Sequence, residues 1–258
     1  MAGHARSVQS PSLPRAVRDV CADVLGAVAD LVLPDTCPGC EMRSAPPACP
    51  ECLAQLDAVP RRRAPDPLPS GLPVPWSIAP YAGAVRALIV VHKEHGRLAL
   101  ARPLGAALAR SVVVAAAHDA DLPLGVVLVP VPSARAAVRR RGHDATLRIS
   151  EHAAGWLRAH GVAASVARGL DHARRIADQS ALGHAARAAN LAGALAARPG
   201  LVQRVRRVPG PLVVVDDVVT TGATLTEAVR AVRAAGVPVA GTAVVAATQR
   251  QVPKPLSA

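Results

Sequence analysis

A strand-length apolar run, Leu212–Val215, leads directly into two adjacent carboxylates, Asp216 and Asp217. A short loop rich in hydroxyl groups follows, and a helix with an apolar face then begins near Thr224. A buried strand, a short loop and a helix in this order are typical of parallel α/β proteins. The chain is therefore expected to fold around a parallel sheet, with polar groups gathered where this strand ends.

The residue types in this loop suit a phosphate. A helix N-terminus offers unpaired N–H groups and a partial positive charge, and threonine hydroxyls add further donors. Gly222 lacks the Cβ that would keep the backbone away from an anion. The two carboxylates repel phosphate and instead suit the vicinal hydroxyls of a ribose, with Mg²⁺ or a developing positive charge nearby. The sequence therefore predicts a sugar-phosphate site made of Asp216, Asp217, Thr220, Thr221, Gly222, Ala223 and Thr224.

The pattern of the remaining chain predicts how this unit is embedded. Thr224 and Glu227 fit a capping box at the start of the helix, and Gly236 sits where a C-terminal cap belongs. Predicted strands at 125–131, 162–167, 211–217 and 237–247 alternate with predicted helices at 98–117, 144–160, 181–197 and 224–235. Such alternation predicts an α/β fold with a mostly parallel, doubly wound sheet and ligands at the carboxyl ends of its strands.

Four of the five cysteines form two Cys-x-x-Cys pairs separated by eight residues. Each pair can make a tight knuckle that presents two thiolates, and two knuckles complete a tetrahedral metal site. Zinc in a structural role is favoured over the alternative, an iron site of the rubredoxin type, because no other redox feature is present. Disulfides are disfavoured because thiols stay reduced in the expected cytosolic setting. The predicted ligands are Cys37, Cys40, Cys49 and Cys52.

Composition suggests an anionic partner. The formal net charge is +12, and only Lys93 and Lys254 among the 30 basic residues are lysines, so 28 are arginines. The arginines are spread along the chain, and Trp76, Trp156 and Tyr81 are too few aromatics for a base-stacking platform. No secretory leader is recognisable, and apolar stretches such as Val112–Ala117 are short for a membrane span. A cytoplasmic location without a transmembrane segment is expected.

Two further segments are candidates for ligand contacts. The predicted strand 125–131 runs into a proline-flanked loop and clustered arginines, which suits a pyrophosphate, although a solvated basic turn is the alternative. Its candidate residues are Val131, Pro132, Ser133, Arg139 and Arg141. Arg187 and Asn190 lie three residues apart on one predicted helical face, so they point either at one site or at solvent.

The segment Leu212–Thr224 resembles the signature of type I phosphoribosyltransferases, which bind 5-phosphoribosyl-1-pyrophosphate (PRPP). By this resemblance Asp216 and Asp217 hold the ribose 2′- and 3′-hydroxyls, and Thr220–Thr224 wraps the 5-phosphate. The ligand would be accompanied by Mg²⁺.

The order of several segments resembles ComF-type proteins (ComF/GntX-like), which join a double zinc ribbon to a phosphoribosyltransferase domain. One departure concerns Gly142, which is followed by His143-Asp144-Ala145 where the family has an apolar or aromatic residue and then Asn-Gln. The matching segments are Leu33-Pro34, Lys93–Gly96 with Leu98-Ala99, Pro130–Pro132, Arg139-x-Arg141-Gly142, Gln179-x-x-Leu182 with Arg187, and Asn190–Ala194.

The resemblance implies a part in handling single-stranded DNA during natural transformation, with DNA-uptake proteins as partners. Two alternatives stay open: a PRPP- or nucleotide-sensing adaptor without turnover, and a nucleic-acid-binding protein with a vestigial sugar-phosphate site. The expected organisation is an N-terminal tail with an amphipathic helix (1–35), a Cys₄ module (36–56), a Pro/Arg-rich linker (57–80), a phosphoribosyltransferase-type domain (81–250) and a C-terminal tail (251–258).

Overall fold

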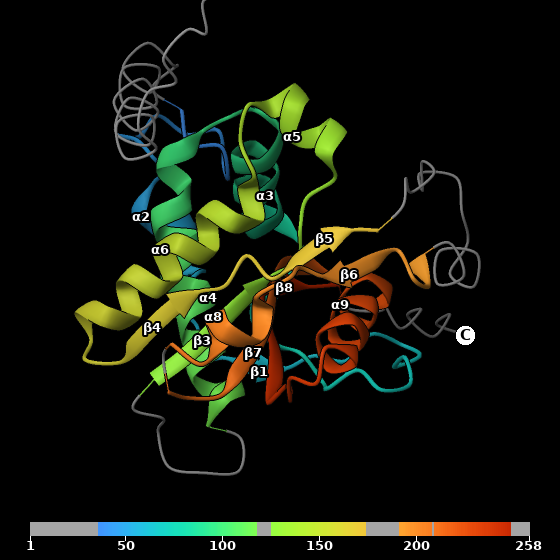
Figure 1. The fold of residues 1–258 in the computed structure, drawn as a ribbon. Coiled ribbons are helices and arrows are strands. Elements are labelled where there is room, and N and C mark those ends of the chain that lie inside the picture. Colours follow the sequence, from blue (N-terminus) through green and yellow to red (C-terminus); the bar gives the residue numbers. More distant parts are fainter. Residues whose placement is uncertain (1–35, 118–124, 174–190, 208, 249–258) are drawn as a thin grey trace, which may run out of the picture.

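The computed structural model describes residues 36–117, 125–173, 191–207 and 209–248, and their main feature is a six-stranded sheet (Figure 1). Five neighbouring strands run parallel, and the short β1 joins one edge antiparallel. The strand order is β1 (Arg61–Arg62), β2 (Trp76–Pro80), β8 (Gly241–Ala247), β7 (Leu212–Val219), β3 (Gly125–Pro130) and β4 (Ala163–Val166).

Alternate residues of β7 enter two different cores. Val213 and Val215 pack with residues of α4 (Ala101–Ala116) and α6 (Ala145–Ala159) on one face of the sheet. Leu212 and Val214 pack with residues of α9 (Ala223–Ala234) on the other face. Because side chains of a strand alternate between faces, a strand covered on both sides must be continuously apolar. The α/β fold with a mostly parallel, doubly wound sheet is confirmed.

The chain leaves β3 and β7 in opposite directions. From β3 it passes through α5 (Arg135–Arg141) and α6 to β4, whereas from β7 it passes through α9 to β8 on the other side. The carboxyl ends of these two neighbouring strands therefore frame a topological switch point, where helices do not close over the sheet edge. This crevice is where the fold is open to a ligand.

Two segments differ from the prediction. Residues 57–80, predicted as a linker, supply β1 and β2, because extended proline-rich chain can still pair at a sheet edge. Residues 195–197 were expected to end a helix but form β6 (Leu195–Ala197), which pairs antiparallel with β5 (Leu170–His172). Alanine and leucine favour helix locally, and the contacts of β6 with β5 and α9 override that preference. Residues 181–190 of the predicted helix, and residues 1–35 with their amphipathic segment, lie outside the described part.

The cysteine segment packs on the sheet domain rather than standing apart from it. Cys37, Cys52 and Leu56 belong to the same buried cluster as Leu88 of α3 (Gly83–Glu94) and Leu104 of α4. Short elements complete the described chain: α2 (Pro50–Ala54), η1 (Leu98–Leu100) and α8 (Leu201–Val205).

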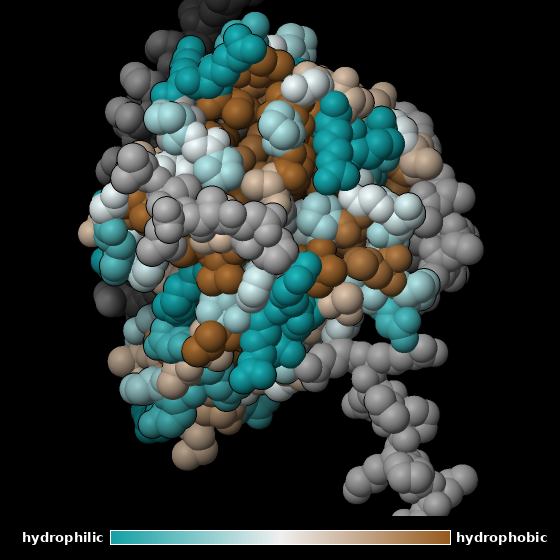
Figure 2. Space-filling view, turned by 90° about the horizontal axis from the view of Figure 1, so that it is seen from below, coloured by the Kyte–Doolittle hydropathy of each residue, from teal (hydrophilic) through white to brown (hydrophobic). Residues whose placement is uncertain are grey.

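One stretch, Leu98–Ala116, is long and apolar enough to cross a membrane by length and composition. More than half of it is buried within the protein, where α4 packs against α6 and β8, as expected of a core helix. The helix itself was predicted at 98–117, but only its uninterrupted apolar run was compared with a membrane span, because Arg102 and Arg110 divide the stretch. On the face drawn in Figure 2, apolar residues gather in patches that are edged by hydrophilic ones.

Candidate functional site

A cleft with a volume of about 470 Å³ lies at the carboxyl ends of β3 and β7. Its walls come from five parts of the chain: the end of β7 with the start of α9, the loop after β3 with α5, the C-terminal half of α3, the first turn of α6, and the loop between β2 and α3. Its charged and hydroxyl-bearing lining residues are Tyr81, Lys93, Glu94, Ser133, Arg141, Thr146, Asp216, Asp217, Thr220 and Thr224.

The acidic pair forms the floor of this cleft. The Asp217 residue is 3% exposed; its Oδ1 accepts from the Val218 N–H at 2.8 Å and its Oδ2 from Lys93 Nζ at 2.5 Å. Asp216 is half-buried, and its Oδ1 accepts from the Asp217 N–H at 2.8 Å and from Thr146 Oγ1 at 3.4 Å. The two carboxylates are thus held by different partners and are not interchangeable.

The environment moves the pKa of Asp216 and that of Lys93. Burial, and then the negative charge of Asp217, raise the pKa of Asp216 well above its usual value, although Lys93 partly offsets them. Burial alone would lower the pKa of Lys93, but the carboxylates of Asp217 and Asp216 outweigh burial and raise it. Lys93 therefore stays charged, while Asp216 holds a proton more readily than a surface aspartate.

The predicted phosphate loop turns into α9 through Gly222, whose φ of 77° is in the left-handed region. A Cβ at this position would lie 2.8 Å from Leu72 Cδ2 and 3.0 Å from Pro65 Cγ, so glycine is needed for packing against the 57–80 segment. Packing thus gives a second reason for glycine here, beside the approach of an anion, which stays a prediction. Thr220 and Thr224 line the cleft, whereas Thr221 and Ala223 line a different cavity.

The predicted capping box is wrong. The N-cap of α9 is Gly222, so Thr224 lies inside the first turn, and it is Thr221 Oγ1 that accepts from a first-turn N–H, that of Ala223, at 3.4 Å. Glu227 instead accepts from the Leu195 N–H at 3.0 Å and pairs with Arg230, and it thereby fastens β6 to α9. The predicted C-terminal glycine is confirmed, since Gly236 has a φ of 76° and its N–H donates to the Arg233 carbonyl.

The loop after β3 reaches the same cleft. Val131, Pro132 and Ser133 line it, and Ser133 Oγ donates to Asp144 Oδ1 at 2.8 Å. The same Asp144 oxygen accepts from the Leu147 N–H at 3.2 Å and caps α6. Asp144 thus holds both the loop and the helix.

The predicted arginines separate. Arg141 lines the cleft and makes two contacts with Glu94, one of them from Nε to Oε2 at 2.8 Å. Arg139 is exposed and is absent from the lining. Arg187 and Asn190 lie outside the described residues.

Four charged or hydroxyl-bearing lining residues were missed as site residues: Tyr81, Lys93, Glu94 and Thr146. They come from the loop before α3, from α3 and from α6, far in sequence from the acidic pair, and no local motif connects them. Lys93 nevertheless carried a sequence feature, because it is one of two lysines in a chain with 28 arginines.

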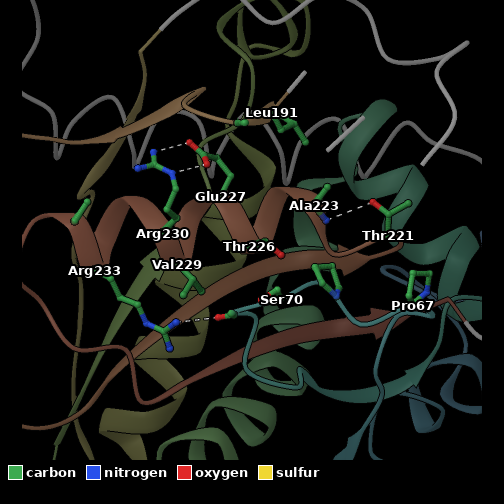
Figure 3. Close-up of a pocket in the computed structure, with 14 residues that line it drawn as sticks. Pro67, Ser70, Leu191, Thr221, Ala223, Thr226, Glu227, Val229, Arg230 and Arg233 are labelled. Atoms are coloured by element: carbon green, nitrogen blue, oxygen red, sulfur yellow. Dashed lines mark hydrogen bonds and ion pairs between the residues drawn. The ribbon is translucent and has the colours of Figure 1, made fainter. Parts of the chain in front are cut away.

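A larger cavity of about 990 Å³ runs along the outer side of α9 (Figure 3). Its lining is mainly apolar, with Pro67, Leu191 and Val229 among its residues. Its charged residues are already paired, since Arg230 contacts Glu227 and Arg233 donates to the Gly71 carbonyl at 2.8 Å. The smaller cleft is the better candidate site because it holds the acidic pair at the switch point.

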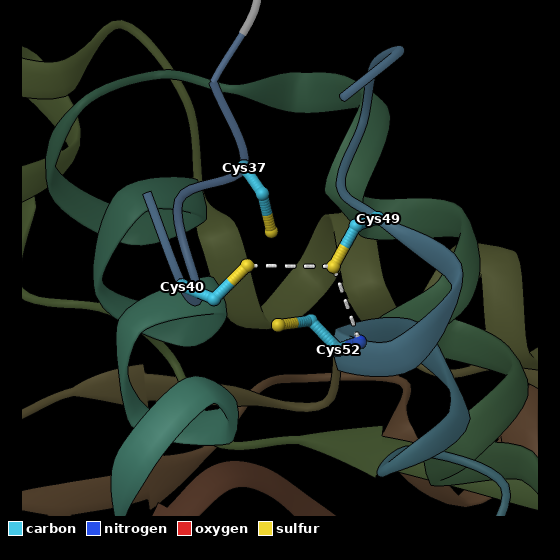
Figure 4. Close-up of side chains that lie close together, drawn as sticks. All are labelled: Cys37, Cys40, Cys49 and Cys52. Carbon is cyan, nitrogen blue, oxygen red and sulfur yellow. Dashed lines mark hydrogen bonds between the residues drawn. The ribbon is translucent and has the colours of Figure 1, made fainter. Parts of the chain in front are cut away.

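The four predicted metal ligands come together. Their Sγ atoms all lie within 4.8 Å of one another, and Figure 4 shows them turned toward a common centre. Backbone N–H groups of Gly39 and Cys52 point at the sulfurs of Cys37 and Cys49, at 3.3 and 3.4 Å. Burial would raise the pKa of Cys37, but backbone hydrogen bonds lower it to about 6. A closed set of four sulfurs with N–H support fits a tetrahedral ion such as Zn²⁺.

Comparison with known proteins connects the cleft to a family. Residues 210–257 match the family model of the phosphoribosyl transferase domain, a match that begins just before β7 and includes α9 and β8. No curated protein matched this chain. The chain therefore combines a phosphoribosyltransferase domain, recognised in its C-terminal part, with an N-terminal four-cysteine cluster.

Proposed function

We propose that this phosphoribosyltransferase-domain protein binds PRPP, or a closely related sugar phosphate, between the carboxyl ends of β3 and β7. The observation that carries the proposal is that three features line one cleft. They are the acidic pair of β7, the first turn of α9, and the loop after β3 with Arg141 at the end of α5. PRPP has a diol, a 5-phosphate and a pyrophosphate, so each part of the ligand has a matching part of the cleft.

In this assignment Asp216 and Asp217 accept hydrogen bonds from the ribose hydroxyls. Thr220 and Thr224, the two residues of the predicted loop that line this cleft, supply donors to the 5-phosphate at the positive end of α9. The pyrophosphate lies toward Val131–Ser133 and Arg141, and Arg141 exchanges its carboxylate partner Glu94 for the anion. Arg139 contributes long-range positive charge from the surface. Mg²⁺ would supply positive charge to the pyrophosphate oxygens when PRPP is bound.

The reaction that follows is transfer of the phosphoribosyl group to a nitrogen nucleophile. The bond between C1 and the pyrophosphate oxygen breaks, and its electron pair leaves with the pyrophosphate. The nitrogen lone pair forms the new bond to C1, and the nitrogen releases its proton to solvent. The carboxylates at the ribose side stabilise the positive charge that develops on the sugar ring.

Calorimetric titration of PRPP with Mg²⁺ into zinc-loaded protein tests the proposal. We expect saturable binding that is lost in Asp216→Asn/Asp217→Asn, because an amide no longer attracts the sugar ring or accepts as strongly. Asp57→Asn is the matched control, since that carboxylate is exposed and pairs with Arg110 away from the cleft. Absence of binding, or equal binding by the double variant, would reject the assignment.

Turnover is measured separately. Release of pyrophosphate in the presence of an amine or nucleobase would support the transferase. Binding without release from any of a panel of acceptors would instead support the sensing adaptor.

A second candidate function, binding of single-stranded DNA in natural transformation, is favoured by the net charge of +12 and by the ComF resemblance. Fluorescence anisotropy with a labelled oligonucleotide tests it across salt concentrations. Affinity that falls steeply with salt would support the function, because such binding releases counterions.

A further inference from the structure

The ammonium group of Lys93 meets the acidic pair from the opposite wall of the cleft. Lys93 is the penultimate residue of α3, and its Nζ lies 2.5 Å from Oδ2 of Asp217, a residue 124 positions later. The Asp217 side chain is 4% exposed and that of Lys93 is 33% exposed. The contact is therefore largely shielded from solvent, where a charge pair is stronger than at the surface.

Among the charged groups around the cleft, Lys93 is the cation that faces the carboxylates of Asp216 and Asp217. The charged groups that face it are Asp216 and Asp217 from β7, Glu94 from α3 and Arg141 from α5. Arg141 is already bound to Glu94 through two nitrogens. Among the described lining residues, Lys93 is then the one that can neutralise a carboxylate pair otherwise subject to its own repulsion.

The choice of lysine at this position is itself informative. The chain has 28 arginines, and it uses arginine at every other described basic position apart from histidines. A guanidinium is a planar fork that binds two acceptors side by side, whereas an ammonium is a compact charge that can approach one oxygen. A small cation between α3 and β7 leaves room in the cleft for a ligand.

We propose that Lys93 is a positioning residue of the ribose end of the site, whose ammonium holds the Asp217 carboxylate oriented to accept hydroxyl groups of a sugar phosphate. This inference rests on the proposed function for its ligand. Lys93 acts through Asp217, so its contribution depends on that carboxylate being present.

A double-mutant cycle measured with PRPP and Mg²⁺ tests this dependence. We expect Lys93→Met and Asp217→Asn each to weaken binding by about tenfold or more, as for loss of a hydrogen bond to a charged group. The double variant should bind no more weakly than Asp217→Asn alone. Arg86→Met, which removes an exposed cation from the same helix, is the matched control and should bind as wild type. Fully additive losses, or no loss in Lys93→Met, would overturn the proposal.

The pH dependence of binding separates a charge effect from a packing effect. The charge of Lys93 lowers the pKa of Asp216, so removing it raises that pKa further, and as the pH is lowered PRPP affinity should begin to fall at a higher pH in Lys93→Met than in wild type. Lys93→Arg keeps the charge and should keep the wild-type pH profile, even where its affinity is lower. Identical profiles for all three proteins would contradict the role assigned to Lys93.

A ligand-free measurement keeps the test independent of the proposed function. The carboxyl ¹³C resonance of Asp216, followed with pH, should titrate at least about one pH unit higher in Lys93→Met, because the charge of Lys93 lowers the pKa of Asp216. If wild-type protein binds no PRPP, the proposed function fails, yet this shift still decides whether Lys93 governs the pair. An unchanged titration would overturn the role of Lys93 whether or not PRPP binds.

Discussion

At the scale of single residues, Gly222 shows how the start of α9 depends on the proline-rich segment beneath it. We expect Gly222→Ala to lower the free energy of unfolding more than Gly236→Ala does. The difference between the two losses should be about 1–2 kcal/mol, because only the Cβ at position 222 clashes with its neighbours. Both glycines have positive φ, but a Cβ at Gly236 would have no neighbour within 4 Å, whereas one at Gly222 would meet Leu72 and Pro65. Urea unfolding of the two variants measures the difference, and equal losses would show that backbone conformation alone requires glycine there.

Local chemistry explains how far single residues could be predicted. Asp216, Asp217, Thr220 and Thr224 were predicted to lie near one another because they follow one strand within nine residues. The partnership of Lys93 with Asp217 joins residues 124 positions apart, so it depends on the packing of α3 against the end of β7. No spacing pattern in one sequence records such a contact.

Glu227 illustrates a motif with more than one structural meaning. A threonine followed three residues later by glutamate can cap a helix, but here the glutamate is 4% exposed and binds β6. The hydroxyl of Thr224 belongs to the cleft instead. Both residues of the motif are present, but the contact of Glu227 with Leu195 determines what the glutamate binds.

At the scale of elements, the attachment of the β5–β6 pair to α9 depends on this buried carboxylate. We expect Glu227→Gln to lower the free energy of unfolding by about 2 kcal/mol, because hydrogen bonds to Arg230 and Leu195 lose their charge. Glu151→Gln is the matched control: its half-exposed pair with Arg168 should contribute less than about 1 kcal/mol. Urea unfolding at neutral pH compares the two.

The same carboxylate gives this attachment a pH dependence. Burial would raise the pKa of Glu227, but Arg230 and the Leu195 N–H outweigh it and hold the pKa below its ordinary value of 4.5. Its stabilisation is therefore complete above pH 4.5 and is lost as the pH falls through the lower folded-state value. The difference between wild type and Glu227→Gln should shrink in acid, and a constant difference would contradict this account.

At the scale of the whole molecule, the cysteine cluster and the sheet should unfold as one unit. Cys37, Cys52 and Leu56 share a buried cluster with Leu88 and Leu104, so the metal module has no core of its own. We expect zinc release and the fluorescence change of the tryptophans in β2 and α6 to coincide on heating. Removal of the metal should lower the unfolding temperature by about 10 °C or more.

Cys52→Ser extends this test to the ligand site. Arg97, which follows α3, donates to the Thr36 carbonyl beside the module. At the start of α3, Ala84 packs closely on Gly39 of the module, where a Cβ would lie 3.0 Å from the Ala84 Cβ. The module therefore contacts α3 near both of its ends. Loss of the metal should therefore weaken PRPP binding through Lys93 as well as stability. Zinc release well below the main transition, with PRPP affinity unchanged, would show that the two parts are independent.

The fold was predictable where local residue preferences agree with the tertiary packing, and less predictable where packing overrides them. The valine run of β7 predicted a strand covered on both faces, and both cores are present. The edge of the sheet was not predicted, since the prolines of residues 57–80 suggested a connection rather than β1 and β2.

That edge bears on how the protein behaves at high concentration. A sheet of parallel, valine-rich strands offers its outer strands to other molecules as templates for aggregation. Here β1 consists of two exposed arginines, Arg61 and Arg62, and covers the outer side of β2. At the opposite edge, Arg158 donates to the Ala164 carbonyl of β4 at 2.8 Å. Cationic side chains thus stand at both margins of the sheet, and mutual repulsion between molecules there would favour monomers in solution over edge-to-edge fibres.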